Sequence, residues 1–159
     1  MKSGAEINRA DKYGQRPLYA ACSNDHEKVV ECLMEYGAEV NRGNIDGETP
    51  LYVACSDGDE KIVECLLKWG AEVNRTTKNG GTPLHIASSN SYEKIIDSLV
   101  KCGAEINYVN QYGWTPLFEA YRKGHENAVQ YLVKYGVNIN SVTYTGWTVL
   151  GVPKLLDFL

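Results

Sequence analysis

Three histidines and five cysteines are the residues of this 159-residue sequence best suited to act as acid–base groups, nucleophiles or metal ligands. No two cysteines have CxxC spacing, and the cysteines and histidines do not combine into a metal-binding pattern. His26, His85 and His125 stand far apart, and the GxxxxGK[ST], GxSxG and HExxH motifs are absent. We therefore expect no enzymatic activity, no metal and no cofactor.

A second group of residues is suited to recognition. Aromatic rings and arginine contribute much of the binding energy at protein interfaces, and the carboxy-terminal half of the chain is rich in aromatic residues. The group consists of Tyr112, Trp114, Tyr144 and Trp147 with Arg122 and Lys123. Whether these side chains meet depends on the elements that carry them.

Those elements follow from a repeat in the sequence. The phrases RPLYAAC, TPLYVAC, TPLHIAS and TPLFEAY are variations of one another. Two sets of residues recur every 33 positions, namely Pro17, Pro50, Pro83 and Pro116, and Gly4, Gly37, Gly70, Gly103 and Gly136. A fixed period of this length predicts a stack of similar supersecondary units.

The second unit, residues 44–76, shows how each repeat is expected to fold. Gly47 permits the positive φ of a tight turn, which predicts a hairpin-like finger. Thr49 is a helix-capping residue, and Pro50 suits the first position of the helix that follows. A second, longer helix with one apolar face then ends at Gly70. The unit is a finger, a short helix and a longer helix.

Stacking is required because two short helices bury too little apolar surface to offset the ordering of about thirty residues. The 33-residue period, TPLH at 82–85 and GAEVN at 37–41 and 70–74 resemble the ankyrin repeat family, over residues 4–148. The resemblance implies an all-α repeat solenoid, an ankyrin-like stack of helix-turn-helix units with hairpin-like fingers. It does not identify a partner, because family members share an architecture and differ in function.

We expect one domain over residues 1–159. Residues 1–10 would be the end of a truncated repeat, the full repeats would cover about 11–43, 44–76, 77–109 and 110–142, and residues 143–159 would be a partial carboxy-terminal capping repeat. A terminal repeat normally has a polar outer face, so a start inside a repeat favours a fragment of a longer protein.

Both ends depart from the repeat pattern. Arg16 replaces the capping threonine of the first full unit, so we expect its helix to lose about 1 kcal/mol and to fray first. Near the other end, Val149 replaces the proline, and Pro153 falls where the first helix would continue. A helix restarted at Pro153 is expected to cover the fourth unit. Alternatively, residues 154–159 form a leucine-rich docking motif for another protein.

In proteins with this resemblance, partners lie across the concave surface formed by the finger tips and the exposed side of the first helices. The predicted partner-binding residues are Tyr13, Asp46, Tyr112, Trp114, Arg122, Lys123, Tyr144 and Trp147. Four of them are expected to cluster on adjacent fingers, beside Arg122 and Lys123 at the end of the neighbouring first helix: Tyr112, Trp114, Tyr144 and Trp147. The alternative is that these rings pack on one another and only stiffen the fingers.

Three further sets of residues stand in register, and we predict structural roles for them. Tyr19, Tyr52, His85 and Phe118 are expected to bridge neighbouring units. Arg9, Arg42 and Arg75 follow Glu6, Glu39 and Glu72 by three residues, which favours intramolecular ion pairs over a basic binding surface. Cys22 with Cys55, and Cys32 with Cys65, are expected to be reduced core residues.

Composition narrows the class of partner. The net charge of -4 gives no global reason to expect a nucleic acid partner, and no apolar run reaches the roughly 20 residues of a membrane span. We expect a monomeric, cytoplasmic or nuclear, non-catalytic module that binds a protein or peptide. Two alternatives remain: a structural spacer or scaffold segment, and an array attached to an enzyme or channel domain outside this sequence.

Overall fold

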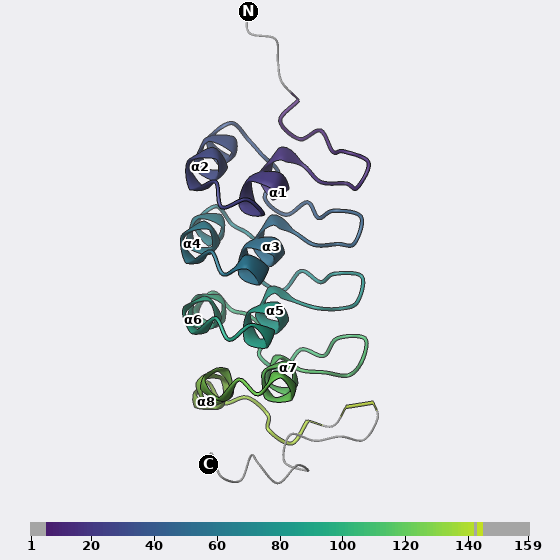
Figure 1. Cartoon of the computed structure of the whole chain (residues 1–159), viewed down its shortest axis with the longest axis vertical. Helices are drawn as coiled ribbons and strands as arrows, with labels where there is room; N and C mark the ends of the chain where they lie inside the picture. Colours follow the sequence, from purple (N-terminus) through teal and green to yellow (C-terminus); the bar gives the residue numbers. More distant parts are fainter. Residues whose placement is uncertain (1–5, 142, 145–159) are drawn as a thin grey trace, which may run out of the picture.

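The computed structural model describes residues 6–141, 143 and 144, and within them it contains eight α-helices and no strand. The helices are α1 (Pro17–Cys22), α2 (Glu27–Glu35), α3 (Pro50–Asp57), α4 (Glu60–Lys68), α5 (Pro83–Ser89), α6 (Glu93–Lys101), α7 (Pro116–Lys123) and α8 (Glu126–Lys134). They form four pairs stacked along the long axis, with the fingers projecting to one side (Figure 1). This arrangement confirms the predicted all-α repeat solenoid.

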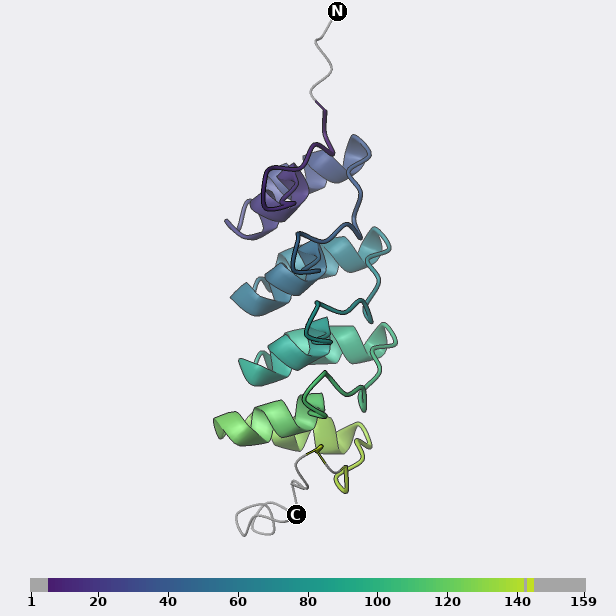
Figure 2. The ribbon, with the colours of Figure 1, turned by 90° about the vertical axis from the view of Figure 1, so that its right-hand side faces the viewer.

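The stack has two helical layers. The first helices, α1, α3, α5 and α7, form the inner layer beside the fingers, and the second helices form the outer layer (Figures 1 and 2). Each inner helix packs on the neighbouring inner helices and on its own outer helix. The leucine of each repeated phrase is at most 2% exposed, as at Leu84 and Leu117. Burial of these side chains between repeats supplies the apolar contact that one unit lacks.

Threonine capping starts three of the four inner helices. The Thr49 hydroxyl accepts from the Tyr52 amide at 3.1 Å, and Thr115 repeats this bond at Phe118 at 3.2 Å. Thr82 caps α5 in the same way. Arg16 stands at the corresponding position of α1 and makes no side-chain cap, as its residue type predicts.

The fingers are hairpin-like turns bonded to one another. In the second finger, Gly47 has a φ of 80°, and the Asn44 amide donates to the Glu48 carbonyl at 3.0 Å. Successive fingers are joined by single backbone bonds, such as that from the Lys78 amide to the Asp46 carbonyl at 2.8 Å. These bonds hold the finger tips in register along the stack.

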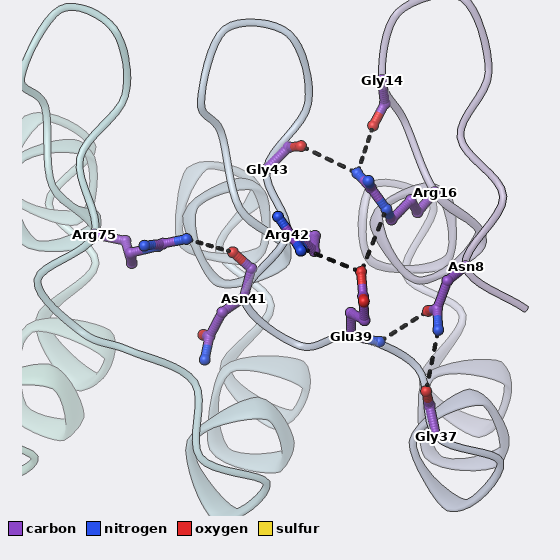
Figure 3. Close-up of polar contacts among 9 residues, drawn as sticks. All are labelled: Asn8, Gly14, Arg16, Gly37, Glu39, Asn41, Arg42, Gly43 and Arg75. Carbon is purple, nitrogen blue, oxygen red and sulfur yellow. Dashed lines mark hydrogen bonds and ion pairs between the residues drawn. The ribbon is translucent and has the colours of Figure 1, made fainter.

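An asparagine ladder links the repeats through the segments that lead from the end of each outer helix to the next finger. Asn8 donates its side-chain amide to the Gly37 carbonyl at 3.3 Å and accepts from the Glu39 amide at 2.9 Å (Figure 3). Asn41 and Asn74 repeat both bonds one unit further on. We did not predict this ladder, although the asparagine that closes each GAE-x-N phrase was its sequence signal.

The register-related arginines pair within their own loops. The Arg42 Nε lies 3.2 Å from a Glu39 carboxylate oxygen, and the corresponding distances at Arg9 and Arg75 are 3.8 Å and 3.6 Å. Arg16, which does not share that register, lies 3.8 Å from the same Glu39 carboxylate oxygen. It also donates to the Gly14 and Gly43 carbonyls, both at 3.3 Å, and so ties its finger to the next one (Figure 3). These bonds compensate in part for the missing helix cap.

The cysteine prediction was half wrong. All five cysteines are free thiols, and Cys22 and Cys55 are fully buried. Burial raises the pKa of the Cys22 thiol to about 12 and also raises the pKa of Cys55. Cys32, however, is exposed, and Cys65 is only half-buried. Both lie on outer helices, Cys32 on α2 and Cys65 on α4, and Cys65 lines an open cavity between these helices.

Two predictions concern the ends of helices and of the chain. Gly70 has a φ of 81° directly after α4, which confirms it as the left-handed residue that ends the helix. The predicted capping helix at Pro153 and its rival, the docking motif, lie outside the described residues. None of the helices that the structure describes is long and apolar enough to cross a bilayer.

Candidate functional site

An open groove of about 370 Å³ lies between the fingers and the inner helices of the second, third and fourth helix pairs. We call it the finger–helix groove. Its wall on the finger side consists of Asp46, Glu48, Thr77, Lys78, Asn79, Gly81, Asn110 and Tyr112, and its helical wall consists of Tyr52, His85, Ile86, Ser89 and Glu119. Three repeats therefore contribute to one surface, and two predicted contact residues, Asp46 and Tyr112, lie on it.

An aromatic cluster adjoins the groove on the fourth finger and α7. The rings of Tyr112 and Trp114 have centroids 5.2 Å apart, and Trp114 lies 5.7 Å from Phe118. The Arg122 guanidinium carbon is 4.7 Å from the centroid of the Trp114 ring, within the range of a cation–π contact. Arg122 also forms a 3.1 Å ion pair with Glu119. The structure thus brings together three of the predicted cluster residues.

The remaining predicted residues lie elsewhere. Tyr144 is 74% exposed on the next finger, where its ring sits so close to Gly113 that a Cβ there would meet Tyr144 Cγ at 2.9 Å. Lys123 is exposed at the end of α7. Tyr13 is exposed on the first finger and does not line the groove, and Lys12 lies over its ring at 4.7 Å. Trp147 lies outside the described residues.

The carboxylates of the groove differ in their partners. Asp46 lies 3.9 Å from the Lys78 ammonium group. Glu48 accepts hydrogen bonds at Oε2 from the Tyr19 hydroxyl at 3.0 Å and from the Asn44 side-chain amide at 2.8 Å. Burial and the Glu48 charge raise the pKa of Tyr19 above its ordinary value. The bond from Tyr19 to Glu48 joins the first inner helix to the second finger.

His85 confirms the predicted bridge between repeats. Its Nε2 donates to the Trp114 carbonyl of the next repeat at 2.9 Å, because a carbonyl can only accept. Its Nδ1 accepts from the Thr82 hydroxyl at 2.8 Å. Burial lowers the pKa of His85 to about 4, and the bond to Trp114 opposes that shift. A neutral imidazole with both nitrogens engaged has a structural role.

Tyr52 lines the groove from α3. Its ring is half-buried, and its hydroxyl forms no hydrogen bond with the residues that the structure describes. Burial first, and then the charges of Glu48 and Glu119, raise the pKa of Tyr52 to about 12. The hydroxyl therefore stays protonated, and it has no hydrogen-bond partner among the described residues.

The family follows from a comparison with family models. A model described as ankyrin repeats (3 copies) matches residues 1–77, 37–110 and 70–143, which together span residues 1–143. The chain belongs to the ankyrin repeat family. Ankyrin repeats are generally protein–protein interaction modules, and the family is typically non-enzymatic. No curated protein matches the chain.

A larger cavity of about 550 Å³ lies on the other side of this ankyrin repeat stack, between α2 and α4. Its lining is mostly charged, with four glutamates and two lysines beside Trp69. Lys61 and Glu27 already form a 2.9 Å ion pair across it, and exposed pairs of this kind are solvated surface. The groove is the better candidate because it combines three repeats, aromatic rings and an unused polar group.

Sequence reasoning missed part of the groove. It assigned Tyr52 a structural role, and it gave Glu48 and Gly81 no role in binding. For Glu48 and Gly81, the available signal was the register that they share with Gln15 and Trp114. This one position of the repeat carries four different residue types. No group of three or more His, Cys, Asp or Glu side chains within residues 6–141, 143 and 144 could hold a metal.

Proposed function

We propose that this ankyrin repeat chain is a non-catalytic interaction module that binds a partner protein or peptide in the finger–helix groove and on the adjoining aromatic cluster. The observation that carries the proposal is that three successive repeats line one groove with different residues. A partner lying along the stack would meet a new set of side chains every repeat, which is the basis of specificity in a solenoid.

The aromatic cluster supports the same proposal. Tyr112 is 49% exposed even though its ring packs on Trp114, so its free face can contact a partner without any rearrangement. The Arg122 side chain is 44% exposed beside it. Tyrosine, tryptophan and arginine together are the residue types most enriched at binding hot spots. Packing and binding are therefore compatible roles for these rings.

We further infer a monomeric module, cytoplasmic or nuclear, that takes neither a cofactor nor a nucleic acid. The net charge of -4 supports this part of the proposal, because a polyanion would meet no basic surplus. The nearest basic groups to the groove, Lys78 and Arg122, are both paired with carboxylates.

A structural spacer is the second candidate, and the links between repeats favour it. The asparagine ladder, the backbone bonds between fingers and the Lys94–Glu60 ion pair at 3.0 Å all join neighbouring units. A spacer uses these links and needs no particular residues in the groove. The two functions therefore differ in their sensitivity to exposed groove residues.

Affinity capture from cell lysate tests the proposed function. We compare the wild type with a Tyr112→Ala/Arg122→Ala variant, in which both altered residues are exposed. The matched control is Tyr36→Ala, which removes a 73% exposed tyrosine at the end of α2. Loss of a specific captured protein in the double variant alone supports binding at the groove. Identical capture by all three chains, each with wild-type unfolding behaviour, would favour the spacer.

A further inference from the structure

The third repeat leaves a gap in the wall of the groove. The position that follows each finger-tip glycine carries Gln15, Glu48, Gly81 and Trp114 in the four repeats, so only the third lacks a side chain. A Cβ at Gly81 would lie 3.3 Å from Thr77 Oγ1 and 3.7 Å from Tyr52 Oη. Its φ lies outside the left-handed region, so the backbone does not require glycine there. A larger residue would press on the Thr77 hydroxyl and on Tyr52, and it would take up part of the groove that Gly81 lines.

The gap opens onto an excess of negative charge. The lining contains three carboxylates, from Asp46, Glu48 and Glu119, and one ammonium group, from Lys78. Asp46 is paired with Lys78, and Glu119 with Arg122. Glu48 forms no ion pair with any described residue, and both of its hydrogen bonds from side chains reach the same oxygen, Oε2. No hydrogen bond from a described residue reaches its Oε1.

The gap also carries aromatic and hydroxyl groups. Tyr52 lies against the space at Gly81 and has an unused hydroxyl. Tyr112 borders the same groove from the next finger with half of its surface exposed. A planar cation can stack on such rings while it bonds to a carboxylate. A lysine ammonium group is not planar and cannot stack on the rings in the same way.

We propose that the partner inserts an arginine side chain into the groove at Gly81, where the guanidinium group pairs with Glu48 and lies beside Tyr52 and Tyr112. This inference rests on the proposed function and specifies the chemistry of its partner. The stem of the arginine occupies the space that Gln15, Glu48 and Trp114 fill in the other repeats. The guanidinium group neutralises the one carboxylate of the groove that has no cation.

The test uses random dodecamer peptides displayed on phage and selected on the wild-type chain. We expect the selected peptides to share an arginine. Replacing that arginine with citrulline, a neutral side chain of the same shape, is expected to weaken binding about tenfold or more, because a charge-assisted bond is lost. Gly81→Gln and Glu48→Gln should each weaken binding of the arginine peptide to a similar extent.

Two controls separate this proposal from the proposed function. Ala20→Gln adds the same side chain as Gly81→Gln at an exposed position of α1 outside the groove, and it should leave binding unchanged. Thermal unfolding of each variant must match the wild type, and Gly81→Ala serves if Gly81→Gln unfolds early. The Tyr112→Ala/Arg122→Ala variant reports whether a peptide uses this face at all.

The outcomes are distinct. The first concerns selected peptides that bind the wild type and fail to bind Tyr112→Ala/Arg122→Ala. If these peptides share no arginine, or if citrulline does not weaken them, the arginine anchor is overturned and the proposed function stands. Peptides that bind that variant and Gly81→Gln as tightly as they bind the wild type contradict both proposals. Failure to select any peptide counts against both as well. An arginine peptide that loses affinity with citrulline and with Gly81→Gln supports both.

Discussion

Each repeat contributes an outer helix on one side and a finger with an inner helix on the other. The amino-acid sequences of the repeats are more alike in the outer helices than on the finger–helix side. The outer helices read EKVVECLME, EKIVECLLK, EKIIDSLVK and ENAVQYLVK, and their Lys61–Glu27 and Lys94–Glu60 pairs recur from unit to unit. On the other side, the equivalent positions Gln15, Glu48, Gly81 and Trp114 share neither charge nor size.

This difference separates stacking from recognition. Every interface between neighbouring repeats has nearly the same geometry, so the same residue types pack there in each repeat. A partner does not share the 33-residue period, so the surface that binds it need not carry the same residues in every repeat. Substitutions at repeated buried positions should therefore affect stability, whereas substitutions at varied exposed positions should affect binding.

The largest expected effect comes from a repeated core position. Leu84 is fully buried at the start of α5, and Leu84→Ala should cost about 2–5 kcal/mol of unfolding free energy, because it removes apolar contacts and leaves a cavity. Urea unfolding measures the change. Leu84→Met is the control, with an expected loss below about 1.5 kcal/mol. A loss below about 1 kcal/mol for Leu84→Ala would break the link between repetition and stability.

His85 is expected to be an exception to this rule. The residue type at its position varies among the repeats, yet we expect its substitution to affect stability. Because folding lowers the pKa of His85 to about 4, the unfolded chain takes up a proton first as the pH falls below about 6.5. The stability that neutral His85 contributes is present above that pH. We expect about 3 kcal/mol of it to be lost as the pH falls toward the folded-state pKa.

The measurement is urea unfolding of the wild type and His85→Gln across this pH range. Carboxylates titrate in both chains, so the informative quantity is the difference between their pH profiles. The wild type should lose its advantage over His85→Gln as the pH falls. Parallel profiles would show that the imidazole is not a buried neutral bridge.

A smaller effect is expected at the repeated helix caps. Thr115→Ala removes the oxygen that accepts from the Phe118 amide and should cost about 1 kcal/mol. Arg16→Thr should change stability by less, because the cap that it introduces is offset by the loss of the Arg16 bonds to Gly14 and Gly43. Chemical unfolding of both variants checks this order. A gain of more than about 1 kcal/mol for Arg16→Thr would mean that those bonds contribute nothing.

The smallest effect is expected on the outer surface. Lys61 pairs with Glu27, but its side chain is 78% exposed, and exposed pairs contribute little because water screens them. Lys61→Ala should leave the urea unfolding midpoint and partner capture unchanged. Loss of capture would place a binding surface on the outer helices and would contradict the assignment of binding to the finger–helix side.

The repeated features could be predicted from the sequence because each has a local cause. The caps at Thr49 and Thr115 and the positive φ of Gly47 follow from residue type and spacing within one unit. Cys32 could not be placed in this way, because a shared position in a periodic pattern does not say which side of the outer helix it faces. Its exposure depends on how neighbouring outer helices pack.

The groove was only partly predictable for a similar reason. Asp46, Tyr112 and Trp114 could be placed by register, but the space at Gly81 depends on Tyr52 of the preceding repeat and Thr77 of its own finger. A missing side chain becomes a pocket only when the residues around it do not close in. Likewise, the role of Glu48 depends on Tyr19, which is one repeat away.

Hydrogen–deuterium exchange with a bound partner tests the central claim most directly. The probe is a protein captured by the wild type, or a peptide selected on it, at saturating concentration. We predict slower exchange in residues 45–57, 77–90 and 110–123, which carry the fingers and α3, α5 and α7, with no change in α2, α4 and α6. Protection confined to the outer helices, with unchanged exchange in the fingers, would contradict the account.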